Sequence, residues 1–158
     1  MKIKIIQNKS LLIMKSQNFQ IKQKIAAFDY GSTLFWNNEN WYDDNLPQIL
    51  KQFIEKDYCI VILSNQNKLL EKEFHNKKMK FIKNIQKIEK EIKTPIYMRA
   101  SCLEDHNRKP DVGMWKSKWP TNKAFYVGDK ITDKLFANNL NVEFYFIDDF
   151  LKHFTDHP

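Results

Sequence analysis

Residues 25–28 read Ile-Ala-Ala-Phe and stop at Asp29, and this stretch decides the fold. A short, continuous apolar run that ends at a polar residue is typical of a parallel strand buried on both faces of a sheet. Residues 59–63 and 124–127 repeat the pattern, and each run again ends at a polar loop. We therefore expect several buried parallel strands whose carboxyl ends carry the polar side chains.

The segments between these runs have helical spacing. Apolar residues recur at helical positions in residues 46–54 and 68–93, and a shorter helix is expected over 133–139. Short strands are expected at 96–98 and 142–147. Alternating strands and helices predict an α/β fold, Rossmann-like, with a central, mostly parallel sheet and helices on both faces. Without a repeat or a linker, the chain is interpreted as a single domain over residues 1–158.

The N-terminal segment is basic, with six lysines and no acidic residue among the first 28 residues. An apolar run at 11–14, a turn at 16–18 and alternation over 19–22 predict a β-hairpin. We interpret residues 1–23 as an N-terminal hairpin or edge extension whose lysines face water. A mitochondrial leader is the alternative.

Composition excludes two common classes of nucleotide-binding protein. The chain has only three glycines, whereas a P-loop needs two at fixed spacing and a dinucleotide fingerprint needs three close together. Binding of ATP or NAD by those devices is therefore excluded. The formal charge of +7 favours a nucleic acid or an acidic protein as partner.

The cysteines and the apolar runs indicate in which cellular compartment the protein resides. Cys59 lies in an apolar run far from Cys102, which favours free thiols over a bridge and an intracellular protein. Nucleus, cytoplasm and mitochondrion stay open. No apolar run approaches the roughly 18–20 residues that a membrane span needs.

Polar side chains follow the predicted strands at one edge of the sheet. Asp29 follows the first strand, Ser64 and Asn65 follow the second, Asp129 follows a later one, and Lys109 lies in an intervening loop. Ligands of such sheets bind beyond the carboxyl ends of the strands. Carboxylates suit Mg²⁺, while a hydroxyl and an ammonium suit a phosphate, so the set predicts a site for a magnesium-bound phosphate group. A carboxylate there could also attack phosphorus, and Asp29 is the candidate.

The same residues resemble the motifs of the haloacid dehalogenase superfamily. Residues 28–34 resemble its first loop, Asp-x-Asp-x-Thr-Leu; residues 62–66 resemble its second motif; Lys109 falls at the third; and residues 128–133 resemble the fourth, Gly-Asp-x-x-x-Asp. A closer resemblance is to the 3′-phosphatase domain of polynucleotide kinase/phosphatase, from about residue 10 to residue 151. Its most specific part is Arg-Lys-Pro at 108–110 followed by Gly-Met-Trp at 113–115.

The resemblance implies removal of a 3′-phosphate from DNA ends, an activity of DNA repair, through an aspartyl-phosphate and with Mg²⁺. By this analogy Asp29 is the nucleophile, and Ser64, Asn65 and Lys109 bind the phosphate. The metal ligands would be Asp29, the backbone carbonyl of Gly31, Asp129 and Asp133. The family's kinase half and a large cap are both missing from the 158 residues.

One position departs from the family pattern. The second aspartate of the first loop, which acts as general acid and base, is Gly31 here. Such catalysis typically contributes ~10²–10⁴-fold. Asp43, Asp44 and His106 lie in loops from which another group could substitute. Two hypotheses therefore stand: a phosphatase of nucleic-acid 3′ ends, or a catalytically dead pseudophosphatase that serves as a structural or binding subunit of a larger assembly.

A third hypothesis is nucleic-acid binding without catalysis. Trp36, Trp41 and Tyr42 lie just after the first loop and could stack on bases. The alternative is that these aromatic side chains cover the edge of the core.

Overall fold

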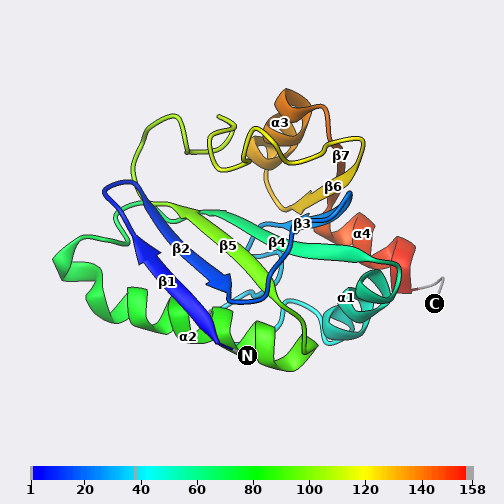
Figure 1. The fold of residues 1–158 in the computed structure, drawn as a ribbon, viewed down its shortest axis with the longest axis horizontal. Coiled ribbons are helices and arrows are strands. Elements are labelled where there is room, and N and C mark those ends of the chain that lie inside the picture. The colour runs from blue at the N-terminus through cyan, green and yellow to red at the C-terminus, as the bar shows by residue number, and fades with distance from the viewer. Residues whose placement is uncertain (1, 38, 156–158) are drawn as a thin grey trace.

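A computed structural model describes residues 2–37 and 39–155 of the chain as a seven-stranded sheet with helices on both faces (Figure 1). The elements are β1 (Ile3–Gln7), β2 (Leu11–Ser16), β3 (Lys24–Phe28), α1 (Leu46–Glu55), β4 (Tyr58–Asn65), the 3₁₀ turn η1 (Lys72–Phe74), α2 (His75–Ile92), β5 (Ile96–Ser101), β6 (Lys123–Gly128), α3 (Ile131–Leu140), β7 (Glu143–Phe146) and α4 (Ile147–Thr155). No described helix is long and apolar enough to cross a membrane.

The sheet has the order β1-β2-β5-β4-β3-β6-β7. The five strands from β5 to β7 run parallel, whereas β1 and β2 are antiparallel additions at one edge. The α/β prediction is therefore confirmed, and the apolar runs at 25–28, 59–63 and 124–127 lie in β3, β4 and β6. Between β3 and β4 the described chain forms only loops and α1, with no inserted cap domain.

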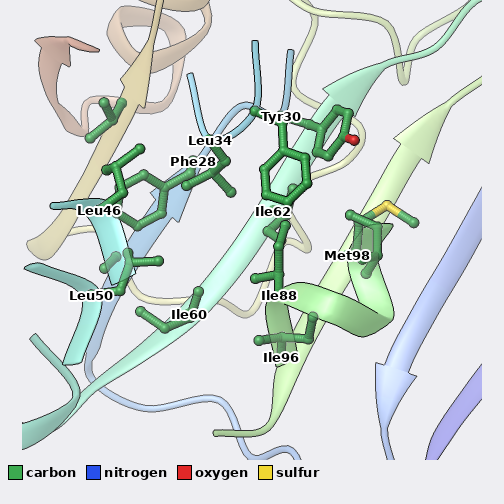
Figure 2. Packing of buried hydrophobic residues seen from close by; sticks show 14 of the residues in the cluster. Phe28, Tyr30, Leu34, Leu46, Leu50, Ile60, Ile62, Ile88, Ile96 and Met98 are labelled. Carbon is green, nitrogen blue, oxygen red and sulfur yellow. The ribbon is translucent and has the colours of Figure 1, made fainter. Parts of the chain in front are cut away.

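Two apolar clusters lie on opposite faces of the sheet. The first packs α1, α2 and α4 against side chains such as Phe28, Ile60 and Met98 (Figure 2). The second packs α3 and the loop that holds Trp115 and Trp119 against the other face. Because neighbouring residues of a strand point to opposite faces, the central strands are apolar at nearly every position. This rigid sheet fixes where each strand ends.

The N-terminal hairpin is present, and the run at 11–14 lies in one of its strands as expected, but the partner strand is a different one. The strands are 3–7 and 11–16, and the described residues 19–22 form no strand. The reason is local: the side-chain oxygen of Asn8 accepts hydrogen bonds from the N–H groups of Ser10 and Leu11, which closes the turn early. Phe19 instead packs edge-on against Tyr97.

Other boundaries shift by less. The helix expected over 68–93 begins at His75, after η1, and the strand expected at 96–98 extends to Ser101. Met114 and Trp115 are buried in a loop. Cys59 and Cys102 are buried free thiols, as predicted.

Candidate functional site

The site lies where three neighbouring parallel strands end. Strand β3 pairs with β4 on one side and β6 on the other, so the residues that follow them meet at one edge. Asp29 follows β3, Ser64 and Asn65 close β4, and Asp129 follows β6. The structure thus brings the predicted residues together, because the parallel pairing aligns their carboxyl ends.

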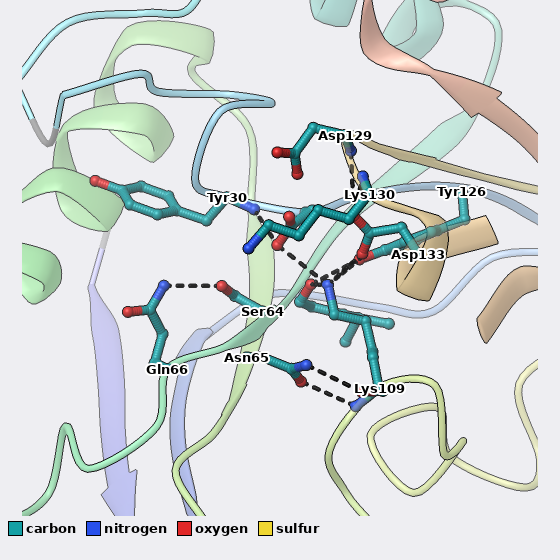
Figure 3. A network of polar contacts seen from close by, with 11 residues as sticks. Tyr30, Ser64, Asn65, Gln66, Lys109, Tyr126, Asp129, Lys130 and Asp133 are labelled. Carbon is teal, nitrogen blue, oxygen red and sulfur yellow. Dashed lines mark hydrogen bonds and ion pairs between the residues drawn. The ribbon is translucent and has the colours of Figure 1, made fainter. Parts of the chain in front are cut away.

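Lys109 reaches this edge from the loop between β5 and β6. Its ammonium lies 3.1 Å from Asp29 Oδ1 and 2.7 Å from Asp133 Oδ1, with its side chain only 2% exposed. It also donates to the carbonyl oxygen of Leu63 at 3.0 Å and to the hydroxyl of Tyr126 at 2.6 Å (Figure 3). A buried ammonium needs this many partners to offset its lost hydration, so its position is closely fixed.

Asp133 connects Lys109 to the start of α3. Its Oδ1 accepts from Lys109, and its Oδ2 accepts from the backbone N–H groups of Asp129 and Lys130, both at 3.1 Å. A Cβ on Gly128 would lie 2.4 Å from Asp133 Cγ, so only glycine allows this approach. Both oxygens of Asp133 are therefore engaged by protein donors, and its expected role as a metal ligand stays a prediction.

Three carboxylates gather around one ammonium. Oxygens of Asp29, Asp129 and Asp133 all lie within 4.8 Å of one another. Burial, followed by the charge of Asp29, raises the pKa of Asp129 to about 7. Burial also raises the pKa of Asp29, although Lys109 opposes this shift. Three carboxylates outnumber the single Lys109 ammonium, and burying like charges together is unfavourable, so the cluster would be stabilised by a further positive charge.

The donor set fits a hard divalent cation. Oδ1 of Asp129 is buried and has no hydrogen-bond partner among the described residues. At Asp29, both Lys109 and the backbone N–H of Tyr30 contact Oδ1, at 3.1 and 2.8 Å, and no described N–H donor contacts Oδ2. Carboxylate oxygens are the ligands that Mg²⁺ prefers. Asp29 and Asp129 could therefore hold Mg²⁺, which would supply the missing positive charge.

Ser64 and Asn65 differ in what they offer a phosphate. The Ser64 hydroxyl accepts from Gln66 Nε2 at 2.9 Å and has no hydrogen-bond acceptor among the described residues, so its proton is available. Both side-chain atoms of Asn65 bind the backbone of Lys109, at 3.1 and 2.9 Å (Figure 3). Asn65 thus holds the Lys109 loop; that it binds phosphate stays a prediction.

Gly31 leaves open space where the family carries its acid–base carboxylate. A Cβ added at this position would meet no heavy atom within 4 Å. None of the three suggested substitutes has a hydrogen bond or ion pair to Asp29 or Asp129 in the described structure. Asp43 accepts from the N–H of Asn45 in the turn before α1, and Asp44 and His106 are exposed.

Two features of the site escaped sequence reasoning. The Tyr126 hydroxyl bonds Lys109 from inside β6, where its apolar neighbours conceal it in the sequence. Tyr42 donates to Asp148 at 2.8 Å, and both residues line a cavity of ≈ 440 Å³ together with Asp129 and Ser32. Asp148 lies near the C-terminus of the chain, and no local pattern connects it to the site.

The aromatic residues after the first loop divide into two kinds. Trp41 and Tyr42 are partly buried against the core, and the Trp41 indole donates to Glu91 at 2.8 Å. Trp36 is 60% exposed. Trp36 is therefore the most exposed of the three rings.

The model of one protein family, described as polynucleotide kinase 3 phosphatase, matches residues 10–151. The bifunctional polynucleotide phosphatase/kinase of Schizosaccharomyces pombe is 30% identical over 163 residues, which cover 85% of this chain and 39% of that protein. An uncharacterised 20.8 kDa protein of Autographa californica nuclear polyhedrosis virus is 29% identical over 160 residues, or 83% of this chain and 87% of the viral one.

Solved structures agree on the fold. A haloacid dehalogenase-like phosphatase from Mesorhizobium loti superposes with a TM-score of 0.67 at 13% identity, over 87% of this chain and 78% of that one. A chain of a Pnkp1/Rnl/Hen1 complex superposes with a TM-score of 0.53 at 13% identity, over 84% of this chain and 47% of that one. The fold is therefore haloacid dehalogenase-like.

Proposed function

The chain belongs to the polynucleotide kinase 3 phosphatase family, and on that premise we propose that it hydrolyses the terminal phosphate of nucleic-acid 3′ ends. The observation that carries the proposal is the buried contact of Asp29 with Lys109 at 3.1 Å, beside the Asp129 carboxylate. That arrangement provides a nucleophile, a fixed cation and a metal-binding carboxylate at one strand edge.

Each side chain has a distinct part in this reaction. A carboxylate oxygen of Asp29 attacks phosphorus, the bond from phosphorus to the 3′ oxygen breaks, and the phosphoryl group is transferred to Asp29. Lys109 and the Ser64 hydroxyl bind the phosphoryl oxygens and offset the charge that develops on them. Mg²⁺ held by Asp29 and Asp129 would neutralise further negative charge.

The weak point of the mechanism is proton transfer. The 3′ oxygen must gain a proton as it leaves, and a water must lose one to hydrolyse the aspartyl-phosphate. Gly31 has no side chain for either step, and water alone would serve both. We therefore expect a slow enzyme, by ~10²–10⁴-fold relative to one with the carboxylate.

A second candidate function follows from the same glycine. The open space at Gly31, and the lack of any hydrogen bond or ion pair from Asp43, Asp44 or His106 to Asp29 or Asp129 in the described structure, favour a pseudophosphatase that binds an end or a protein partner without turnover. The chain spans 39% of the fission yeast relative. A chain of the Pnkp1/Rnl/Hen1 complex has a similar fold, and a role within a larger assembly is part of this proposal.

Phosphate release from a 3′-phosphorylated oligonucleotide separates the two functions. The wild-type protein with Mg²⁺ is compared with Asp29→Asn, and with Asp57→Asn as a matched control at the opposite, amino-terminal end of β4. Release that is lost in Asp29→Asn but kept in Asp57→Asn supports the enzyme. Release at the level of Asp29→Asn in all three proteins, with retained binding of the oligonucleotide, supports the pseudophosphatase.

A further inference from the structure

A second cavity lies on the face of the sheet opposite α2, away from the carboxylate cluster. It measures ≈ 920 Å³ and is lined by Arg99 of β5 together with Lys116, Lys118 and Trp119 of the loop before β6. Arg99 shares its face with Tyr97, in the apolar cluster on this side, whereas α2 packs on the other side. In Figure 1 the loop between β5 and β6 crosses the sheet on the side of α3.

Arg99 is a buried cation with few partners. Arg99 is only 9% exposed, and within the described residues its guanidinium donates one hydrogen bond, from Nη1 to the hydroxyl of Tyr97 at 3.2 Å. Its Nε is buried with no hydrogen-bond partner among the described residues. None of the four ion pairs of the described chain includes Arg99. A guanidinium this buried normally has an anionic partner.

The cavity itself supplies no such partner. Arg99, Lys116 and Lys118 contribute three positive charges, and no Asp or Glu is among the described residues that line it. Three cations with no acid favour a multivalent anion over a single carboxylate. A guanidinium binds phosphate oxygens with two parallel N–H donors, and the lysines add charge at the rim. The volume suits a small organic ligand.

We propose that this cavity binds a phosphate group, with the Arg99 guanidinium as its principal donor and Lys116 and Lys118 as rim charges. The phosphate comes either from a phosphomonoester or from the backbone of a polynucleotide strand. This site is separate from the catalytic proposal, because none of its residues belongs to the carboxylate cluster.

Calorimetric titration of the whole protein in EDTA tests the proposal. EDTA removes divalent cations, and without them the three carboxylates of Asp29, Asp129 and Asp133 repel phosphate probes. Probe binding at that cluster therefore does not add to the binding measured at the Arg99 cavity. The probes are inorganic phosphate, thymidine 5′-monophosphate and a short oligothymidylate with a 3′-hydroxyl. The variants are Arg99→Met, Asp29→Asn and, as a control of equal charge on the exposed side of α2, Lys83→Met.

Saturable binding is expected for the wild type, Asp29→Asn and Lys83→Met alike, and Arg99→Met should weaken it about tenfold or more. Tighter binding of the oligonucleotide than of the monophosphate identifies a backbone phosphate as the source, and the reverse identifies a phosphomonoester. No saturable binding of any probe, or equal weakening by Arg99→Met and Lys83→Met, overturns the proposal. Retained binding by Asp29→Asn makes the result independent of catalysis.

A second pair of variants covers the case in which Arg99→Met does not fold. The double variant Lys116→Met, Lys118→Met changes only exposed side chains, and Lys83→Met, Lys90→Met removes the same charge from α2. Weaker binding in the first double variant than in the second supports the proposal, and equal binding in both contradicts it.

Discussion

The Asp133 carboxylate and the Lys109 ammonium form an ion pair with an N–O distance of 2.7 Å, and each side chain is only 2% exposed. Asp133 also accepts from the N–H groups of Asp129 and Lys130 at the start of α3. One carboxylate therefore ties the Lys109 loop to α3, the helix that follows Asp129. Because separating a buried ion pair is energetically costly, the pair keeps the Lys109 ammonium and Asp129 in fixed positions relative to each other.

Replacing Lys109 with methionine should lower the free energy of unfolding by about 3–5 kcal/mol, because two buried carboxylates lose their counter-charge. Urea denaturation measures the change. The loss should be smaller at pH 5 than at pH 8, because burial raises the pKa of Asp29 and its carboxylate takes up a proton more readily at the lower pH. Lys22→Met, which breaks the exposed pair of Lys22 with Asp57, should change stability little. An equally small effect of Lys109→Met would mean that the pair contributes no stability.

Asp129→Asn should raise the melting temperature of the metal-free protein and abolish phosphate release. The substitution removes a partly buried carboxylate that Asp29 repels, at the cost of a metal ligand. Thermal melting in EDTA and the phosphatase assay are the two measurements. A lower melting temperature in EDTA would show that Asp129 stabilises the fold and would contradict the repulsion argument.

Mg²⁺ should raise the melting temperature of the wild-type protein, because the folded carboxylate cluster binds it and the unfolded chain does not. At a Mg²⁺ concentration of about 100 times its dissociation constant, binding should increase the free energy of unfolding by roughly 2.7 kcal/mol. Asp129→Asn should lose most of this rise and Asp57→Asn should keep it. An equal rise in both variants would place the bound cation away from the cluster.

The stability of the metal-free protein should fall as the pH rises from about 4 to about 7. Burial and the charge of Asp29 raise the pKa of Asp129 from 3.8 to about 7, so the folded state holds a proton over this window that the unfolded chain has released. The state that binds more protons is favoured at low pH, which here is the folded one. Urea denaturation in EDTA at pH 5 and pH 7.5 measures the slope, and Asp129→Asn should flatten it. An unchanged slope in that variant would assign the proton to another group.

Gly31→Asp should increase phosphate release by ~10²–10⁴-fold if the remaining site is competent. A Cβ at this position meets no heavy atom within 4 Å, so the backbone accepts a side chain there without a clash at its first atom. Gly31→Asn is the matched control, since it has the same shape and no acid–base function. No gain in Gly31→Asp, in a protein that still binds Mg²⁺, would mean that the site has lost more than this carboxylate.

The sequence alone determined the sheet and the order of its site residues. Apolar runs such as 25–28 and 59–63 are typical of buried parallel strands, and in a parallel sheet the polar residues after them, Asp29 and Ser64, lie at one edge. The sequence shows these features because the periodicity of apolar residues and the length of an apolar run depend only on neighbouring positions in the chain. The hairpin was expected, but its register depended on the turn that Asn8 closes.

Only the tertiary structure decided how the side chains of the site are used. Asn65 faces the backbone of Lys109, Tyr126 accepts a hydrogen bond from Lys109 within a strand, and Asp148 approaches from the far end of the chain. The cavity at Arg99 likewise depends on a long loop packing over β5. Such contacts join residues distant in sequence, and their geometry follows from packing and from the need to pair buried charges, neither of which leaves a periodic signal in the chain.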